Sequence, residues 1–388
     1  MTKKRILLVG SAARSLIHFR GDFIKSLHAS NYAVYAAAPN MEIEVQEGLK
    51  NLGAIPLTFS LSRTGLNPFK DIKSIMSLKQ IVDKYNIDII FPYTIKPTIY
   101  SSVAGRWAKI PVVSLITGLG FTFSGNSKKA LMLQKLTKKM YRFALRKNKV
   151  VIFQNRDDLR LFVENKLLSN TQKTAIVSGS GVNLGKYPYR ENANDSEVIR
   201  FIMVARLIEE KGISLYLQAA ENLKKLFPKA EFHVIGSPDR SPSAIKLEEI
   251  QELADKNIIV YHGNQKNVPK YLSNSDIFVL PSFYREGIPR SILEALSIGM
   301  PIITTDSPGC RETIKENTNG ILITPKSQKS LQNAMQFFLE NPAKIKEYGM
   351  ESRKYAEERF NVDIINADLL HIINRSLEKE LTNLDLIL

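Results

Sequence analysis

The chain of 388 residues, 44% apolar and 24% charged, is long enough for two globular domains and too apolar for a disordered segment. Its single cysteine excludes a disulfide framework, and no apolar run reaches the roughly 18 residues of a membrane-spanning helix, so we expect a cytoplasmic protein. The formal net charge is +16, but residues 1–190 alone hold 30 Lys and Arg against 10 Asp and Glu, which indicates that only this half meets an anionic ligand or surface.

The first half alternates short β-branched runs with longer amphipathic segments. Helical spacing occurs at about residues 15–30, 41–52, 68–85, 97–109 and 126–148. The runs between these segments are typical of buried parallel strands: RILLVG, AVYAAAP, IPLTFSL, DIIFPYT, PVVSLIT, VVIFQN and TAIVSG. Alternation of this kind predicts an α/β domain with a doubly wound parallel sheet over residues 1–180.

A second domain is predicted after a linker. Residues 181–198 are polar and lack periodicity, as a linker does. Over residues 199–360 the alternation resumes, with strands expected at IRFIMVA, EFHVIG, IIVYHG, DIFVLP, PIITTD and GILI. Two open α/β domains can direct the carboxyl ends of both sheets at one central cleft, where ligands are expected. Residues 361–388 form a last helix that is expected to cross back to the first domain.

The segment YREGIPRSILEAL (284–296) places Glu286 and Glu294 on either side of a Gly-x-Pro turn. Pro289 suits the first helical position, and the free amides that follow form a ready phosphate site. Gly287 lets a ligand approach the backbone. Glu294 can then accept hydrogen bonds from a vicinal diol such as ribose, and Glu286 can reach a hydroxyl beyond the phosphates. The alternative is a first-turn acid and an ordinary surface charge.

Two cations complete this pattern. The segment VARLIEEKG (204–212) follows the first strand of the second half and supplies Arg206 and Lys211 at the carboxyl edge of the sheet. A guanidinium fork and an ammonium are the usual partners of a diphosphate. The alternative is a salt bridge from these cations to Glu209 or Glu210. Together with the two glutamates, they predict a site that holds a sugar nucleotide at both ends.

These residues resemble the retaining family 4 glycosyltransferases of the GT-B fold, and the similarity covers nearly the whole chain. SRTGLNPF (62–69), KPTIYSSVAGRWAKIP (96–111) and TGLGFTF (117–123) are similar to a bacterial subgroup that builds lipid-linked oligosaccharides. That subgroup includes N-acetylgalactosaminyltransferases acting on undecaprenyl-diphosphate sugars. The resemblance implies two Rossmann-like domains, a UDP-sugar as donor substrate, and neither a bound cofactor nor a metal.

The resemblance also assigns roles to residues. Glu294 holds the ribose and Glu286 the donor sugar, while Arg206 and Lys211 grip the diphosphate and, with Glu286, act at the reaction centre. The other donor contacts are expected at Gly236, Gly287, Ile288, Pro289 and Arg290. The histidine that many members carry after the fifth strand is replaced by Thr117, and their Gly-Gly loop after the first strand is replaced by GSAARS (10–15).

Acceptor contacts are expected in the first domain, from residues that follow strand ends: His18, Arg63, Lys96, Thr117 and Gly118. Each of these strands would end at the edge of the sheet where α/β domains bind ligands. For His18 the alternative is a histidine satisfied locally on the first helix.

The segment 126–149 carries nine Lys or Arg and no acid. At 100° per residue, five cations fall in a sector about 100° wide, with Met132, Leu133, Leu136, Met140 and Phe143 on the other side. The five are Lys135, Lys138, Lys139, Arg142 and Arg146. Two interpretations remain open: a packed helix with a solvated basic face, or a face on anionic lipid, where each cation adds roughly 1 kcal/mol. A nucleic-acid partner is not expected, because no aromatic stacking platform accompanies the charge.

The sequence therefore predicts a retaining glycosyltransferase. It would transfer an N-acetylhexosamine such as GalNAc, or a hexose, from a UDP-sugar to a polyprenyl-diphosphate-linked saccharide in the synthesis of bacterial surface polysaccharide or glycan. It would work as a peripheral protein on the anionic cytoplasmic face of the inner membrane. One alternative is a UDP-sugar epimerase of the same architecture, which needs no acceptor. Another is a non-catalytic lipid- or polyanion-binding protein, which would not respond to UDP.

Overall fold

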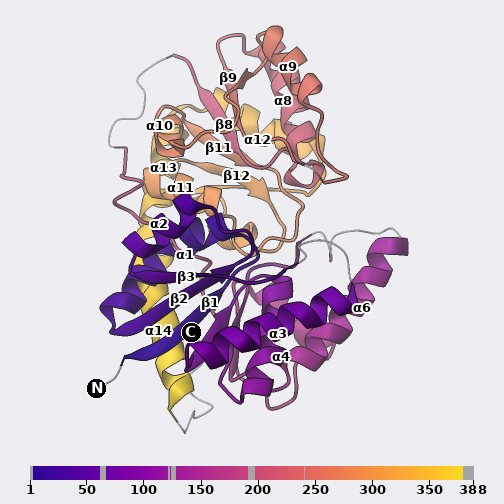
Figure 1. The fold of residues 1–388 in the computed structure, drawn as a ribbon. Coiled ribbons are helices and arrows are strands. Elements are labelled where there is room, and N and C mark those ends of the chain that lie inside the picture. The colour runs from indigo at the N-terminus through magenta and orange to yellow at the C-terminus, as the bar shows by residue number, and fades with distance from the viewer. Residues whose placement is uncertain are drawn as a thin grey trace. The chain divides into compact units, whose positions relative to one another are not determined.

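The chain forms two compact units in its computed structural model, Met1–Ser180 with Asp363–Leu388, and Gly181–Val362. The structure describes residues 3–61, 67–120, 123, 128–190, 197–239 and 241–378. In each unit a parallel sheet lies between helices (Figure 1). The doubly wound α/β architecture predicted from the alternating pattern is confirmed in both.

The sheet of the first unit is parallel throughout. Its two stretches run in the order β3-β2-β1-β4 and β5-β6-β7, and parallel bridges from Ile90 to Val112 and from Tyr93 to Leu115 join β4 to β5. The strands are β1 (Lys4–Val9), β2 (Tyr32–Ala38), β3 (Ala54–Thr58), β4 (Ile89–Pro92), β5 (Val113–Ile116), β6 (Val150–Phe153) and β7 (Thr174–Ile176). Most of the apolar runs thus become strands that are buried on both faces, whereas β3 at the edge of the sheet is only partly buried.

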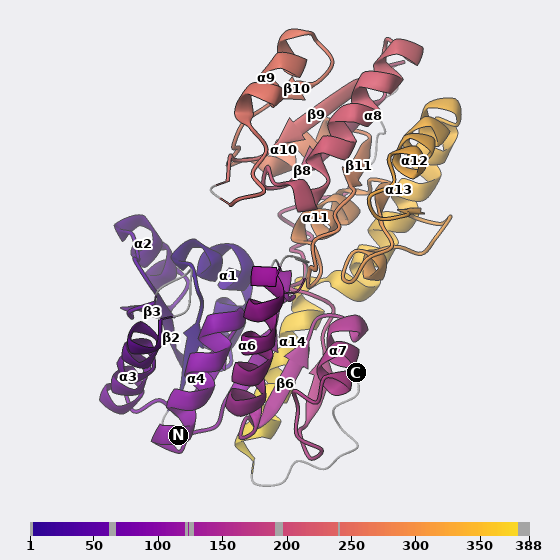
Figure 2. The same ribbon diagram turned by 90° about the vertical axis from the view of Figure 1, so that its right-hand side faces the viewer.

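Helices cover both faces of this sheet. One face packs against α1 (Ala13–Ala29), α2 (Ile43–Asn51) and the last helix, α14 (Val362–Leu377). The other face packs against α3 (Pro68–Lys84), α4 (Ile95–Ala108), α6 (Lys128–Leu145) and α7 (Arg156–Glu164). Along this second face α3 contacts α4, and α4 contacts α6, so that the three helices lie side by side (Figure 2).

The last helix belongs to the first unit, although the chain reaches it from the second. Asn366 of α14 donates a hydrogen bond to the hydroxyl of Ser26 on α1 (3.2 Å). Four apolar residues at helical spacing fill the core that α1 and α2 share: Ile365, Leu369, Ile372 and Ile373.

The second unit has a six-stranded parallel sheet in the order β10-β9-β8-β11-β12-β13. Its strands are β8 (Arg200–Val204), β9 (Glu231–Ile235), β10 (Val260–Tyr261), β11 (Ile277–Leu280), β12 (Ile302–Thr305) and β13 (Gly320–Ile323). Its α-helices are α8 (Ile213–Leu226), α9 (Leu247–Asp255), α10 (Val268–Ser273), α11 (Arg290–Ile298), α12 (Gln328–Glu340) and α13 (Ala343–Tyr355). Short helical turns complete it at Glu209–Lys211, Arg311–Thr313 and Ala356–Phe360.

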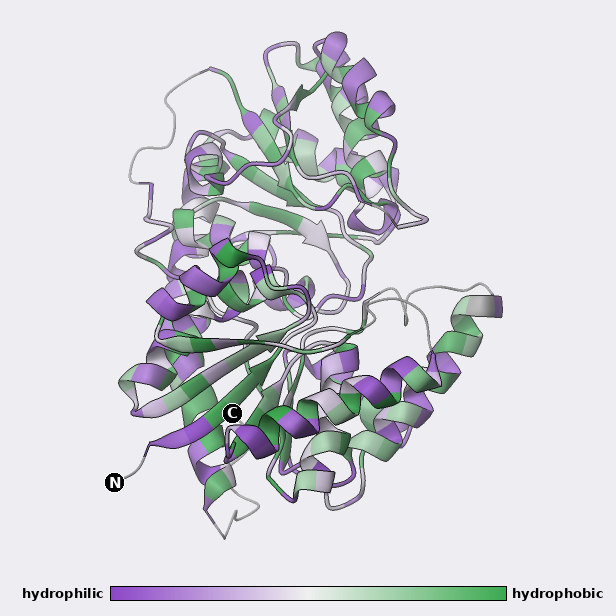
Figure 3. Cartoon of the chain, in the orientation of Figure 1, coloured by the Kyte–Doolittle hydropathy of each residue, from purple (hydrophilic) through white to green (hydrophobic). Residues whose placement is uncertain are grey.

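Part of the segment expected to be a linker packs into this second unit. Val182 and Tyr187 are both buried in its core, and Val182 forms a parallel bridge with Asn361. Across the chain most strands are hydrophobic, whereas the helices carry a mixture of hydrophobic and hydrophilic residues (Figure 3).

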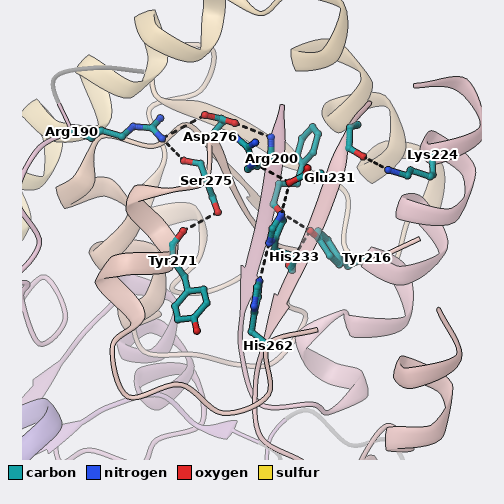
Figure 4. A network of polar contacts seen from close by, with 12 residues as sticks. Arg190, Arg200, Tyr216, Lys224, Glu231, His233, His262, Tyr271, Ser275 and Asp276 are labelled. Atoms are coloured by element: carbon teal, nitrogen blue, oxygen red, sulfur yellow. Dashed lines mark hydrogen bonds and ion pairs between the residues drawn. The ribbon is translucent and has the colours of Figure 1, made fainter. Parts of the chain in front are cut away.

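A polar network lies beside β8 and β9 of the second unit (Figure 4). Arg200, the first residue of β8, contacts Glu231 at 2.9 Å, and its amide donates to Asp276 at 2.8 Å. Glu231 also contacts His233 (3.1 Å), whose second ring nitrogen lies 2.9 Å from His262. Burial lowers the pKa of His233 and of His262. The network therefore holds two imidazoles that burial keeps neutral.

Candidate functional site

The turn that follows β8 is held against the end of β11. Gly212 ends this turn with φ +78°, and a Cβ there would lie 2.3 Å from the carbonyl oxygen of Pro281, so only glycine fits. The amide of Tyr284 donates to the carbonyl of Glu210 at 3.0 Å. These contacts place Lys211 beside the loop that leads into α11.

Lys211 forms an ion pair with Glu286 through its Nζ and the glutamate Oε1. Both side chains are 13% exposed, so the pair is largely shielded but still reachable from solvent. Ser282 donates a hydrogen bond to the same carboxylate oxygen at 3.2 Å. Two residues predicted for the donor site, 75 positions apart in the chain, are thus brought together.

Arg206 lies close to this pair. Its guanidinium contacts Asp239 at 3.1 Å and sits 5.7 Å from the centre of the Tyr284 ring. The ammonium of Lys211 lies 5.6 Å from the same ring centre. Tyr284 therefore joins the two predicted diphosphate cations through cation–π contacts.

The alternative salt bridges are not those of the structure, since the ion-pair partners are Asp239 for Arg206 and Glu286 for Lys211. The carboxylates of the alternative have other contacts: Glu209 accepts from Ser214, and Glu210 accepts from Ser243 at 2.6 Å. Sequence reasoning missed Tyr284 and Asp239. Tyr284 adjoins the glutamate motif, but nothing in the spacing of the motif marks either residue as a partner of Arg206.

The start of α11 differs slightly from the prediction. The helix begins at Arg290, so Pro289 is the capping residue and not the first helical residue. Gly309, with φ +81°, lies so close to this turn that a Cβ would come within 1.8 Å of the carbonyl oxygen of Gly287. The side chain of Ile288 is buried in the core, which leaves its backbone as the part that can meet a ligand.

Glu294 lies in the second turn of α11, where Arg290 donates to its Oε1 at 3.1 Å. Tyr187 approaches the same carboxylate, and burial together with Glu294 raises the pKa of the Tyr187 hydroxyl. Tyr187 was missed because it lies in the segment predicted to be a linker. Glu294 is therefore held in one orientation by two side chains.

Gly236 follows β9 and packs against the end of β8. A Cβ at this position would lie 2.1 Å from the carbonyl oxygen of Ala205, the residue before Arg206. The predicted donor contacts of the second unit therefore come from the ends of β8, β9 and β11, which neighbour one another in the sheet.

The predicted acceptor residues follow strands of the first unit. Thr117 and Gly118 come directly after β5, Lys96 is in the first turn of α4, and His18 is an exposed residue of α1. The fifth predicted residue, Arg63, lies outside the described residues. Because α1 follows β1 and α4 follows β4, the described residues come from three adjacent strand ends.

Lys96 is a partly buried cation. Its ammonium lies 3.9 Å from Asp71, and burial lowers the pKa of Lys96 although the carboxylate opposes that shift. Just before it, Thr94 has φ +68° and ψ 159°, a region that β-branched residues rarely adopt. Backbone strain of this kind tends to collect at functional sites.

The segment GSAARS (10–15), where many family members have a Gly-Gly loop, packs against Tyr93. Tyr93 packs over Gly10, where a Cβ would lie 2.4 Å from the tyrosine oxygen. The Tyr93 hydroxyl lies 2.8 Å from Ser15, and burial raises its pKa to about 12. In this chain a buried phenol therefore fills the turn after β1.

The basic face of α6 is divided between two environments. Lys138 contacts Asn165 at 2.9 Å, and Arg142 donates to the carbonyls of Asn165 and Lys166 at 2.8 Å, just beyond α7. These two cations therefore also stabilise the end of α7. The side chains of Lys135, Lys139 and Arg146 are exposed.

The apolar sector of α6 is not the side of the helix that faces the core. The five apolar residues opposite the cations do not pack together on the sheet: Met132, Leu136 and Phe143 are exposed. The buried residues of the helix are instead Ala130, Thr137, Tyr141, Ala144 and Leu145. The helical wheel therefore predicts which residues of α6 share a side, but it does not predict which side faces the core.

Within residues 3–378 as described, no three or more His, Cys, Asp and Glu side chains come together in a way that could hold a metal ion. None of the described helices has both the length and the apolar character required to cross a bilayer.

Two doubly wound units, one with cations and carboxylates gathered at neighbouring strand ends, have the architecture of the GT-B glycosyltransferases. Residues 189–359 match the family model "Glycosyl transferases group 1", and residues 5–155 match "Glycosyl transferase 4-like". The chain belongs to this glycosyltransferase family, and the resemblance found in the sequence is confirmed.

Two relatives and one solved structure illustrate the match. The chain is 30% identical over 349 residues to the N,N'-diacetylbacillosaminyl-diphospho-undecaprenol alpha-1,3-N-acetylgalactosaminyltransferase of Campylobacter jejuni, covering 87% of this chain and 90% of that protein. It is 29% identical to the UDP-Gal:alpha-D-GlcNAc-diphosphoundecaprenol alpha-1,3-galactosyltransferase of Escherichia coli, over 69% and 70% of the two chains. HepE of Anabaena, solved with UDP and glucose, has a TM-score of 0.74 at 16% identity and covers 96% of this chain and 99% of its own.

Proposed function

We propose that this glycosyltransferase moves a sugar from a UDP-sugar to a polyprenyl-diphosphate-linked saccharide and retains the anomeric configuration. The sugar is an N-acetylhexosamine such as GalNAc, or a hexose such as galactose. The names of both relatives describe transfer to undecaprenyl-diphosphate saccharides, and the similar fold of HepE holds UDP. The observation that carries the proposal is the grouping of Arg206, Lys211 and Glu286 around Tyr284.

The diphosphate of the donor is assigned to the two cations and the start of α11. An ammonium has three donors, so Lys211 can keep its bond to Glu286 and still donate to a phosphate oxygen. The guanidinium of Arg206, on a side chain that is 51% exposed, can accept the diphosphate in bidentate fashion. Backbone amides at Gly287, Ile288 and Arg290 would add donors at a helix start that favours anions.

The two glutamates are assigned to the sugar ends of the donor. Ionised carboxylates have about four acceptor sites each, so the contacts that hold Glu286 and Glu294 leave capacity for substrate hydroxyls. Glu294, fixed by Arg290 and Tyr187, would accept from the ribose. Glu286, fixed by Lys211 and Ser282, would accept from a hydroxyl of the transferred sugar.

The reaction itself needs little covalent chemistry from the protein. With retention, the acceptor hydroxyl attacks the anomeric carbon on the face from which UDP leaves, so the C–O bond to UDP breaks as the new glycosidic bond forms and the hydroxyl proton passes to the departing phosphate. The main contribution of the protein is then to orient the reactants and to stabilise charge on the departing diphosphate. Arg206 and Lys211 are the residues for the second task.

The first unit is assigned to the acceptor and to the membrane. His18, Arg63, Lys96, Thr117 and Gly118 would contact the acceptor, with Lys96 offering positive charge at the start of α4 to its diphosphate. The basic side of α6 would rest on the anionic cytoplasmic face of the inner membrane, where polyprenyl carriers reside. Peripheral attachment suits a substrate of this kind, because each Lys or Arg near the surface contributes roughly 1 kcal/mol.

The test is a transfer assay with UDP-GalNAc, UDP-GlcNAc, UDP-Gal and UDP-Glc, using a short-chain polyprenyl-diphosphate-linked sugar in detergent. We expect acceptor-dependent release of UDP with one of these donors. NMR of the product should show the anomeric configuration of that donor. An inverted linkage would exclude the retaining reaction. Conversion of the donor to its epimer without acceptor would indicate the epimerase instead.

A further inference from the structure

The outer side of α3 carries an apolar stripe that the sequence analysis did not single out. Phe69, Ile72 and Met76 are separated by three and four residues and so lie on one side of the helix. Their exposed fractions are 86%, 50% and 52%. The opposite side of α3 is buried in the core through Leu78 and Val82. The stripe is therefore a second apolar surface on a helix whose packing is already satisfied.

The outer side of α6 has the same character. Leu131, Met132, Leu136 and Phe143 are all more than two-fifths exposed, with Met132 at 69%. On the helical wheel the last three lie beside the sector of the exposed cations Lys135, Lys139 and Arg146. Apolar and basic side chains thus share the solvent side of this helix.

These two surfaces lie on the same side of the first unit. The inner sides of α3, α4 and α6 all pack into one core cluster on one face of the sheet. α4 contacts both of its neighbours, so α3 and α6 flank it on this face (Figure 2). Near its carboxyl end α4 adds Trp107, which is 50% exposed. We call this surface the outer helical face, defined by Phe69, Ile72, Met76, Trp107, Met132, Leu136 and Phe143.

The charges around the outer helical face are positive. α6 contains no carboxylate, and on α3 Lys70 and Lys73 are exposed. The two carboxylates of α3 have partners: Asp71 accepts from Tyr100 at 2.6 Å, and Asp83 pairs with Lys79. Exposed apolar side chains of this number mark an interaction site, and the cations select an anionic partner.

We propose that the outer helical face inserts its apolar side chains into an anionic lipid bilayer while its cations contact the headgroup phosphates. This rests on the proposed function, in which the acceptor is a membrane lipid, and it adds a hydrophobic contact on α3 and α4 to the electrostatic contact of α6. A second copy of the chain fits less well, because two like faces in a symmetric dimer would bring cations against cations. Trp and Phe beside Lys and Arg are typical of residues at the bilayer interface.

Trp107 allows a direct test, because it is the single tryptophan of the chain. The full-length protein is mixed with vesicles of phosphatidylcholine alone or with phosphatidylglycerol, and its intrinsic fluorescence is followed. We expect a blue shift and quenching by brominated lipid only with the anionic vesicles. Binding without any shift or quenching would overturn insertion and leave a purely electrostatic contact.

A triple variant isolates the stripe on α3. Phe69→Ser with Ile72→Ser and Met76→Ser should weaken partitioning into anionic vesicles by about tenfold or more, since each buried methylene contributes to anchoring. The matched control is Leu226→Ser with Met350→Ser, two exposed apolar residues of the second unit, which should bind vesicles as the unaltered protein does. Equal flotation of both variants would overturn the proposal.

Two further readouts separate this inference from the proposed function. The α3 variant should keep its affinity for UDP and its transfer to a detergent-solubilised acceptor. If the unaltered protein transfers sugar but does not bind vesicles, the inference fails and the proposed function stands. If the unaltered protein inserts into vesicles but transfers no sugar, the proposed function fails and the membrane insertion stands. A dimer in solution that the α3 variant abolishes, without vesicle binding, would assign the outer helical face to self-association.

Discussion

The two units use charge in different ways. At the strand ends of the second unit, Lys211 and Glu286 form a partly buried pair beside Arg206, so a few groups in fixed geometry define the site. On the outer helical face of the first unit, exposed cations are spread along α3 and α6. Partly buried pairs are weakly screened by salt, whereas exposed charges are strongly screened. A single substitution at the Lys211–Glu286 site should therefore abolish most of its activity. Binding by the outer helical face should instead weaken gradually with each cation removed and with rising salt.

The largest effect is expected at Lys211. Lys211→Met should lower kcat/KM by about 100- to 1000-fold, because it removes a cation from the departing diphosphate and leaves Glu286 without its partner. Steady-state kinetics at two salt concentrations measure this, and the loss should be similar at both. The control is Lys225→Met, an exposed lysine of the same unit. A loss below threefold would remove Lys211 from the reaction centre.

Reversing the exposed charges of α6 tests the other side of the comparison. Lys135→Glu, Lys139→Glu and Arg146→Glu together should weaken binding to anionic vesicles by about 100-fold, at roughly 1 kcal/mol for each cation. Flotation at low and high salt measures the effect, and UDP affinity should not change. Reversal of Lys225, Lys229 and Lys256, exposed lysines of the second unit, changes the net charge equally and should leave flotation intact. Persistent flotation of the α6 variant would contradict its contact with lipid.

A smaller effect is expected at Glu294, the proposed ribose contact. Glu294→Gln should weaken UDP binding by about tenfold, as expected for the loss of a charge-assisted hydrogen bond to ribose. Tyr187→Phe, which only loosens the orientation of Glu294, should weaken it by about threefold. Titration calorimetry measures both, with Glu221→Gln on α8 as control. If Tyr187→Phe weakens binding more than Glu294→Gln, the ribose contact lies elsewhere.

The smallest effect concerns the two histidines of the polar network beside β8 and β9, His233 and His262. Burial lowers the pKa of His233 and His262 from 6.5, so the unfolded chain takes up protons at a higher pH than the folded chain. Stability should therefore be constant above about pH 7.5 and fall as the pH drops through 6.5. Urea midpoints at about pH 7.5 and 5.5 measure this. His233→Gln should reduce the difference, and His28→Gln, at an exposed position of α1, should not.

Much of the fold could be predicted because strands buried on both faces are short, nearly continuous apolar runs. The runs that became β1 to β13 are short, apolar and regularly spaced, and parallel order follows from the helices between them. The site residues that could be predicted, among them Arg206 and Glu286, lie directly after strands or at a helix start. Their position follows from local sequence, because the carboxyl ends of parallel strands share one edge.

The remaining features depend on contacts between distant segments. Tyr187 lies in a polar stretch and was assigned to a linker, yet it is buried against α11 near Glu294. Asp239 meets Arg206 across a loop of irregular structure. For α6 the pattern fixed which residues share a side, but only the position of the sheet decides that small residues face the core and Met132 faces solvent.

The path of the chain also bears on the order in which this protein is made. The second unit is one continuous segment, whereas the first needs α14, the last described helix, to cover the apolar surface beside α1 and α2. During synthesis, the apolar surface of residues 1–180 that α14 will cover therefore stays exposed to solvent while the second unit is made. The first unit can therefore be completed only after α14 has been synthesised, and a chaperone would have most apolar surface to protect on the nascent amino-terminal half.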